Sequence, residues 1–384
     1  MRFLCVVVLI FLAAIGAAVS NADAQDWTKL KTPWGDPDLQ GIWTNEPTTT
    51  PMERPAEFGD REFLTDEELA EKQGADANRS QGATEEELDG VVRPRDLDRV
   101  TPYDKNIVGQ EYNRFWTDNG AIKVRPAWPR TSLVIDPLDG QVPVFTRELL
   151  QRWETREEAA RGRGQRDDWF DANLGERCLS SARSHTSGTK HIFQIPGYVV
   201  IRANTLNHNE VLVIPLDGRP PLPQHMRLWL GDSRGRWEGD TLVVETTNIV
   251  GKQDGGGKPF LPVHGGLTEH AHYYPGSGSG LRLIERFTRV SDERIEYQYT
   301  FDDPMTYVRP YTVLRPLGKE DEQSYIQVEP SCHAGNRGMP YSLTAARADQ
   351  AYAIQAREDE RAVRLPQYEA LYKELEQWEA SLGR

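Results

Sequence analysis

Glu285 is the residue whose place in the sequence pattern most clearly implies chemistry. In the segment 281–289, Leu283, Glu285 and Phe287 alternate, so the carboxylate shares one strand face with apolar side chains. A carboxylate on a buried face must be paired or protonated, which makes Glu285 a candidate general base or ligand contact. The alternative is a salt bridge to an arginine of a neighbouring strand, such as Arg309.

A second acidic group lies where a strand ends, at Asp302-Asp303-Pro304. Two carboxylates can divide acid and base work when their environments separate their pKa values. Adjacent strand residues face opposite ways, however, so only one of these two can point inward. We favour a turn before Pro304, and we keep Asp303 and Arg309 as catalytic candidates.

Histidines supply the remaining candidates. His270 and His272 alternate as two residues on one side of a strand would, so they could share a metal ion, with a third ligand from His264 or Glu269. The alternative is a solvated Gly-rich loop. His333 is a catalytic candidate because it follows Cys332, although it could equally contact the start of a helix.

The chain begins with the features of an export signal. Arg2 precedes an apolar run from Phe3 to Val19, and Ala22-Asp23-Ala24 provides a small-x-small cleavage site before Gln25. We therefore expect a cleaved signal peptide and a periplasmic or secreted protein. The apolar run is too short for a stable membrane span.

Export also determines the expected chemistry of the cysteines. Cys5 would leave with the signal, so the mature chain keeps Cys178 and Cys332. An oxidising compartment and an even pair favour a disulfide between them. The rival interpretation is a thiol nucleophile at Cys332 beside His333.

Composition restricts the partners. The formal net charge of -14 argues against nucleic acid and anionic lipid, and the mean hydropathy of -0.64 argues against membrane insertion after cleavage. The chain contains no P-loop, dinucleotide glycine motif, Gly-x-Ser-x-Gly elbow, Cys-x-x-Cys or His-Glu-x-x-His motif. We expect a small-molecule ligand or substrate and no cofactor, with a divalent metal at His270 and His272 as the alternative. The sequence does not indicate an oligomeric state.

Strand patterns dominate the second half of the sequence, and residues 294–301 alternate without a fault. Eight strands are expected, at 198–201, 211–214, 226–230, 241–247, 281–289, 294–301, 307–314 and 325–328. Short turns and the lack of crossover helices predict an antiparallel meander that closes into a lipocalin-like barrel. The Gly-rich insertion 251–280 would lie at the barrel mouth, and Gly41-Ile42-Trp43 is typical of an element that closes the bottom.

The fold class is therefore mainly β, with helices outside the barrel. We expect four parts: a signal peptide at 1–24, an irregular N-terminal region with short helices at 25–130, the barrel core at 131–335 and C-terminal helices at 336–384. Capping boxes begin helices at Thr65 and Thr84, and an amphipathic helix is expected over 146–161. Pro366 is expected to break the C-terminal region into two helices. Leu-Asp-Gly turns at 138–140 and 216–218 predict hairpins.

Residues 231–246, with the sequence GDSRGRWEGDTLVVET, resemble a broad family of uncharacterised secreted bacterial proteins. The likeness also includes Glu176-Arg177-Cys178, Leu216-Asp217-Gly218, Glu285-Arg286-Phe287, Asp302-Asp303-Pro304 with Arg309-Pro310, and Cys332-His333 with Gly335-Asn336. It implies export but no particular activity. Members usually have glutamate where this chain has Ala334, so a catalytic role of that glutamate would be lost here.

Three functions fit these observations. The first is a periplasmic acid/base enzyme, a hydrolase, lyase or isomerase, acting on a small organic molecule in the barrel. The second is a binding protein without chemistry, whose cavity would be lined by aromatic residues, namely Trp237, Tyr297, Tyr299 and Tyr307. The third is an envelope protein with a filled barrel.

Overall fold

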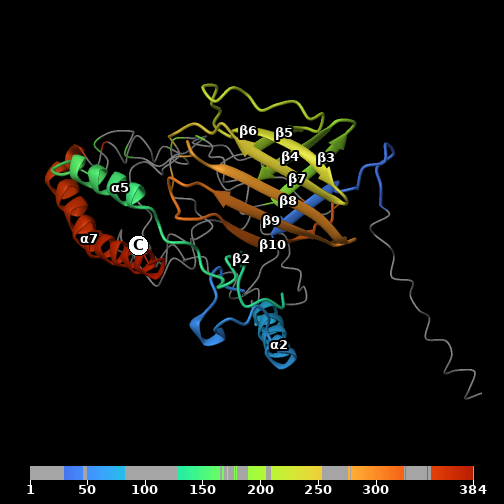
Figure 1. Ribbon diagram of the computed structural model, residues 1–384, viewed down its shortest axis with the longest axis horizontal. Coiled ribbons are helices and arrows are strands. Elements are labelled where there is room, and N and C mark those ends of the chain that lie inside the picture. The colour runs from blue at the N-terminus through green and yellow to red at the C-terminus, as the bar shows by residue number, and fades with distance from the viewer. Residues whose placement is uncertain are drawn as a thin grey trace, which may run out of the picture.

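The computed structural model describes the chain as an antiparallel sheet that curls into a nearly closed barrel, with helices beside it (Figure 1). The described residues are 30–45, 50–82, 128–164, 167, 171, 177, 179, 189–204, 209–252, 276, 278–323, 325, 344 and 347–383. This architecture confirms the expected mainly-β meander.

Nine strands follow one another in the order β5-β4-β3-β1-β10-β9-β8-β7-β6, and the short β2 pairs with β10. Their bounds are β1 Gly41–Asn45, β2 Val134–Asp136, β3 Thr189–Ile195, β4 Tyr198–Asn204, β5 Asn209–Pro215, β6 Asp232–Glu238, β7 Thr241–Thr247, β8 Arg282–Ser291, β9 Arg294–Asp302 and β10 Tyr311–Lys319. All pairs along this path are antiparallel.

The expected alternation holds in the central strands. In β9 every second residue is buried, and Ile295, Tyr297, Tyr299 and Phe301 are completely enclosed. Their rings form part of one continuous apolar core with residues of the other strands. One face of the sheet is therefore the inside of the barrel, and it is filled by aromatic and branched side chains.

The two outermost strands, β5 and β6, close the barrel by side-chain packing. No ladder joins them, but Gly235 of β6 lies directly against Ile214 and Leu216. A Cβ at this glycine would lie 2.6 Å from Leu216 Cδ2 and 2.7 Å from Ile214 Cγ2. The missing side chain of Gly235 therefore allows the ends of the sheet to approach each other.

The Gly-x-Trp segment forms β1, a strand of the barrel between β3 and β10. Trp43 is fully buried, and its indole donates to the Leu39 carbonyl at 2.9 Å. The Arg289 guanidinium lies 5.5 Å from the Trp43 ring centre and donates to the Asp38 carbonyl at 2.9 Å. Gln194 fixes the same segment by accepting from the Leu39 amide at 2.6 Å.

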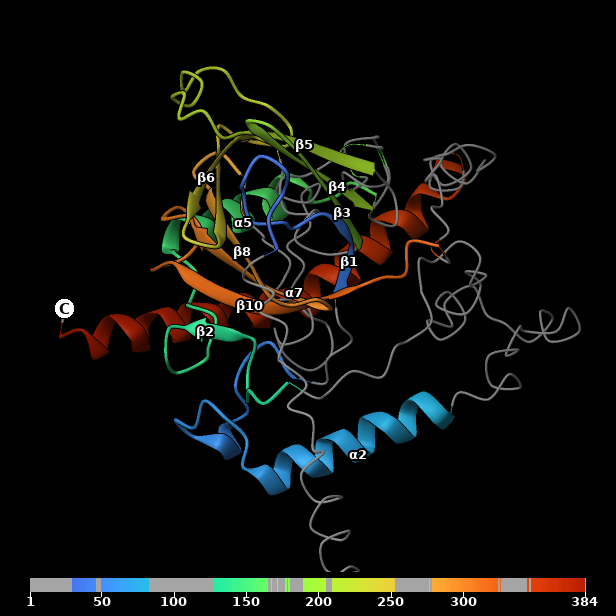
Figure 2. The ribbon, with the colours of Figure 1, turned by 90° about the vertical axis from the view of Figure 1, so that its right-hand side faces the viewer.

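In the described part of the chain, three α-helices and a short 3-10 turn lie outside the barrel: α2 Asp66–Gly82, α5 Arg147–Ala159, α7 Gln350–Ser381 and η2 Ala56–Phe58. The capping boxes are confirmed where they can be seen: Thr65 and Glu68 exchange hydrogen bonds at 2.8 and 3.2 Å, while Thr84 lies outside the described residues. Helix α2 lies on the β2 side, clear of the barrel (Figure 2). Among the described helices, none has both the length and the apolar character needed to cross a bilayer.

Helices α5 and α7 pack on each other beside the barrel (Figure 1). The expected break at Pro366 is wrong, because α7 runs through it as one helix. The tertiary contacts that flank the proline supply the reason: Arg364 pairs with Glu157 of α5 at 2.8 Å, and Tyr368 packs on Trp153. The apolar stripe of α7 therefore packs partly on α5.

Several sequence-based boundaries are corrected. One strand of the barrel, β1, comes from the region 25–130 that was expected to wrap the barrel. Residues 226–230 form no strand; they are irregular apart from an isolated bridge between Leu228 and Ile249. The strand expected at 307–314 is instead β10, which begins at Tyr311 and ends at Lys319. Of the strand expected at 325–328, residues 326–328 lie outside the described residues. The two Leu-Asp-Gly turns do not form hairpins, because α5 follows the first and a long loop to β6 follows the second.

Candidate functional site in the barrel interior

Five ionisable side chains meet inside the barrel and are called the interior cluster here: Lys190, Glu285, Tyr297, Tyr299 and Arg315. They come from β3, β8, β9 and β10, and all but Arg315 are at most 1% exposed. Burying a charged group is unfavourable unless it is paired or performs a function. The cluster is therefore the part of the described structure where chemistry is best supported.

Strand register places the members of the cluster next to one another. Glu285 is opposite Tyr299 across the β8–β9 pair, and Arg315 is opposite Tyr297 across the β10–β9 pair. The Tyr297 hydroxyl donates to Glu285 Oε1 at 2.5 Å. Phe287 stacks on the Tyr297 ring with centroids 4.6 Å apart, so this hydrogen bond lies in an apolar setting.

Lys190 reaches the cluster from β3, which is separated from β9 by two strands. Its ammonium nitrogen lies 4.9 Å from the centre of the Tyr297 ring, a cation–π distance. Burial lowers the pKa of Lys190 to about 7; the Glu285 carboxylate opposes this effect and the Arg315 charge adds to it. Lys190 is therefore divided between its neutral and charged forms near neutral pH.

The tyrosines are held in their neutral forms. Burial raises the pKa of Tyr297 well above its ordinary value, and the Glu285 carboxylate raises it further. Burial also raises the pKa of Tyr299, against the effect of the nearby Arg315 charge. Arg315 also approaches the Tyr299 hydroxyl as a side-chain hydrogen-bond partner, which lowers the pKa of Tyr299, although the geometry of this contact is poor.

This arrangement combines the groups that acid/base catalysis requires. Glu285 can accept a proton, Tyr297 can donate one along a hydrogen bond that is already formed, and Lys190 can do either near neutral pH. Arg315 is a fixed positive charge able to hold an anionic group. The cluster thus brings a base, an acid and a positive charge together inside the packed core of the barrel.

The candidate carboxylate Glu285 lies in this cluster, but Arg309 does not. Arg309 is on the surface, where it forms an ion pair with Asp136 at 3.2 Å. The alternative that Glu285 pairs with Arg309 is therefore wrong. Glu285 instead has Tyr297 as its hydrogen-bond donor and the charges of Lys190 and Arg315 nearby.

Asp303 occupies a turn, as the favoured interpretation predicts. It is 2% exposed and accepts from the Met305 amide at 3.0 Å and from the Thr306 hydroxyl at 2.5 Å. Its neighbour Asp302 faces the outside, 3.6 Å from Arg282. Asp303 is therefore not among the five residues of the interior cluster. Its hydrogen bonds to Met305 and Thr306 stabilise the turn.

Of the four aromatic residues predicted to line a ligand cavity, two lie in the interior cluster and two do not. Tyr297 and Tyr299 belong to the interior cluster, whereas Tyr307 packs between Phe145 and Tyr311. Trp237 packs against the core, and its buried Nε1 has no hydrogen-bond partner within the described part of the chain.

Five predicted site residues lie outside the described residues: His270, His272, His333, Cys178 and Cys332. The metal site and the disulfide therefore remain predictions. Over the described ranges, no group of three or more histidine, cysteine or acidic side chains is placed to hold a metal ion.

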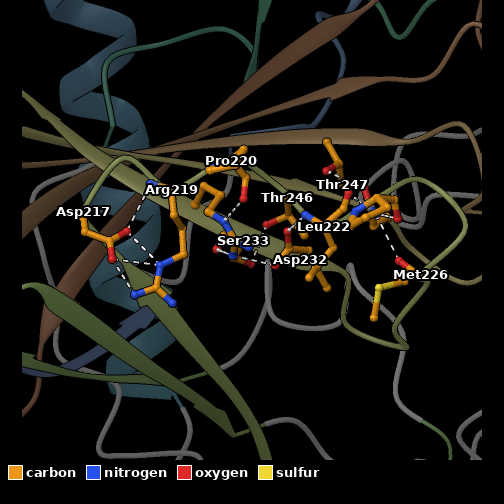
Figure 3. A network of polar contacts seen from close by, with 12 residues as sticks. Asp217, Arg219, Pro220, Leu222, Met226, Asp232, Ser233, Thr246 and Thr247 are labelled. Carbon is orange, nitrogen blue, oxygen red and sulfur yellow. Dashed lines mark hydrogen bonds and ion pairs between the residues drawn. The ribbon is translucent and has the colours of Figure 1, made fainter.

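The segment GDSRGRWEGDTLVVET forms the β6–β7 hairpin, and its polar residues fasten the preceding loop (Figure 3). Asp232 accepts from the Leu222 amide at 2.8 Å, and the hydroxyls of Ser233 and Thr246 are 2.8 Å apart. With the close packing of Gly235, these contacts give the segment a role in closing the barrel.

A surface hollow of about 290 Å³ lies on the outside of the junction between β5 and β6, which is called the seam here. Arg219, Arg234 and Arg236 line it with Glu245, and each of these arginines has an acidic partner. Glu245 in turn is held by Arg282 at 2.7 Å. The hollow thus has balanced charges, and it faces away from the interior cluster.

Sequence reasoning missed Lys190 and Arg315. Arg315 alternates with Val313 and Leu317, so the pattern that identified Glu285 would have identified it too. In β3, Lys190 shares its inward face with Ile192 and Gln194, so this face mixes charged, polar and apolar residues. In both cases the signal was a charge at an inward position of an alternating strand.

No family model matches the chain, and no curated protein or solved structure is detectably similar to it.

Proposed function

We propose that this protein handles a small organic molecule inside its barrel by acid/base chemistry, with Glu285 as the base and Tyr297 as its partner. The observation that carries the proposal is the interior cluster itself. Buried ion pairs contribute little to stability compared with apolar side chains of the same shape. A barrel selected only for stability would gain from replacing these groups, so their presence favours a function.

The cellular setting is part of the proposal. A cleaved signal peptide at 1–24 would export the protein to the periplasm or the medium, where Cys178 and Cys332 could form a disulfide. Small barrels are either filled by side chains or hold one small ligand, and the proposal takes the second possibility.

A filled-barrel envelope protein is the second candidate. It is favoured by the tight interior and by the position of the hollows identified among the described residues, which lie on the outside. This candidate predicts that no small molecule stabilises the protein in a way that requires Glu285.

The test compares Glu285→Gln with Glu245→Gln, which removes an outward-facing carboxylate from the neighbouring strand β7. The melting temperature of the full chain is measured with a panel of small organic acids, esters, alcohols and amines. We expect at least one compound class to stabilise the wild type and Glu245→Gln but not Glu285→Gln. If no class stabilises the wild type, or all three proteins respond alike, the role proposed for Glu285 is wrong and the second candidate is favoured.

A further inference from the structure

The outer surface of strands β3, β4 and β5 is apolar, although it faces solvent. Phe193 and Ile195 of β3 are 43% and 53% exposed, and Val211 and Val213 of β5 are 49% and 58% exposed. The outward positions of β9 instead hold polar side chains, namely Glu296, Gln298 and Thr300. The barrel is therefore polar outside at β9 and apolar outside at β3 to β5.

Strand register gathers the apolar side chains into one patch. Phe193 is opposite Val200 of β4, and Val200 is opposite Val213. In the next row Ile195 is opposite Tyr198. Directly opposite residues have Cβ atoms about 5 Å apart, so their side chains are in contact. The patch is called the β3–β5 face here, and it consists of Phe193, Ile195, Tyr198, Val200, Val211 and Val213 on three adjacent strands (Figure 2).

The sequences of β4 and β5 are typical of strands that are buried on both sides. Residues 198–201 read YVVI and residues 211–214 read VLVI, without a charged side chain. A strand with one face in water alternates instead between apolar and polar residues, as β9 does. The inner face of β5 packs in the barrel core, so its apolar outer face indicates a second layer.

The size of the β3–β5 face fits a contact with another protein surface. Its four exposed side chains present roughly 350 Å² of apolar surface, and apolar patches of about 300–600 Å² on monomers are often functional. A stable dimer buries about 800 Å² on each copy, a little over half of it apolar. The half-buried Tyr198 and Val200 add to the exposed four, so the face supplies most of the apolar area that a dimer requires.

The charges of the face suit a second copy of the same chain. The net charge of -14 makes two copies repel each other over much of their surfaces. Among the described outward residues of β3, β4 and β5, however, none is a carboxylate and only Arg202 carries a full charge. Arg202 is opposite Val211, at one end of the face. A two-fold axis that crosses the strands at Val200 would place Arg202 of one copy over Tyr198 of the other and keep the two arginines apart.

We propose that the β3–β5 face is the interface of a two-fold symmetric dimer, in which two copies pack their sheets face to face as in a β-sandwich. Phe193 and Val213 lie in the row of the axis, so each contacts its equivalent in the second copy. The inference goes beyond the proposed function and does not depend on it, because this face is outside the barrel and the interior cluster is inside.

Sedimentation velocity of the full chain, over a range of protein concentrations, tests this dimer. We expect the wild type to form dimers. Val213→Lys places two ammonium groups against each other in the interface, so it should raise the dimer dissociation constant about a hundredfold or more. Gln298→Lys adds the same charge at an outward position of β9 and is the matched control. It should leave the dissociation constant unchanged.

A milder variant guards against misfolding. Val213 is exposed within one copy, so Val213→Lys should remain folded as a monomer, which circular dichroism verifies. Val213→Thr keeps the shape and the strand preference of the side chain and replaces one methyl group by a hydroxyl. Because each dimer loses two buried methyl groups, its dissociation constant should rise about tenfold.

Two results overturn the inference. If the wild type is a monomer at every concentration, a second copy does not cover the face. A lower melting temperature of Val213→Lys than of Gln298→Lys in that monomer would then show that another part of the chain covers it. If the wild type dimerises and Val213→Lys dimerises equally tightly, the two copies associate through a different surface.

Discussion

The buried amine of Lys190 predicts an unusual dependence of stability on pH. Its pKa falls from an ordinary value of 10.5 to about 7 on folding, and each unit of pKa difference is worth about 1.4 kcal/mol. The largest effect on the free energy of unfolding is therefore about 5 kcal/mol. Lys190 is fully buried, so solvent does not screen this effect.

The sign follows from which state binds the proton. Between about pH 7 and pH 10.5 the unfolded chain is protonated at this lysine and the folded protein is not. Folding therefore releases a proton, and stability rises with pH over that range. Below about pH 7 both states carry the proton, and the full destabilisation is present.

Lys190→Met removes the amine while keeping a side chain of similar length. We expect the stability of this variant relative to wild type to increase by about 3 kcal/mol as the pH is lowered from about 9.5 to about 7. Urea unfolding at a series of pH values measures this difference. Lys373→Met, on the exposed face of α7, controls for the loss of one positive charge. A difference between wild type and Lys190→Met that stays constant over this range would refute the reasoning.

Three further predictions concern the scaffold. Gly235→Ala adds a Cβ within 2.7 Å of Ile214 and Leu216, so we expect a loss of about 1–3 kcal/mol in urea unfolding; unchanged stability would show that the seam is not tightly closed. Thr146→Ala removes the cap of α5, where the hydroxyl accepts from an amide at 3.2 Å, and should cost about 1 kcal/mol; Thr146→Ser, which retains the hydroxyl, is the control. Glu374 is exposed as a residue, but local desolvation of its carboxyl raises its pKa, so its charge opposes folding above that pKa and not below its ordinary value of 4.5. The gain in melting temperature of Glu374→Gln should therefore appear as the pH rises from about 4.5, and a gain that is the same at all pH values would contradict this.

Local patterns predicted much of the scaffold correctly. Strict alternation in β8 and β9 identified the buried faces, and the same alternation identified Glu285 as an inward carboxylate. The helix beginning after Thr146 followed from its capping chemistry. These features depend on residues close in sequence, which is why the sequence reveals them.

Other features depend on which elements lie together. The helix α7 continues through Pro366 because Arg364 and Tyr368 are held by α5, and no local rule contains that contact. Strand β1 joins the barrel between β3 and β10, although its sequence neighbours lie outside the sheet. In both cases tertiary packing outweighed the local signal.

The inward carboxylate of Glu285 was determined by the sequence alone, because a period of two residues fixes which side chains share a strand face. Its surroundings were decided by the tertiary structure. Only the curvature of the sheet brings Lys190, which is separated from β9 by two strands, over the Tyr297 ring. Only the β8–β9–β10 register places Arg315 and Tyr299 beside the carboxylate. Desolvation and charge coupling act through space, so the pKa values and chemistry of these groups exist only in the folded barrel.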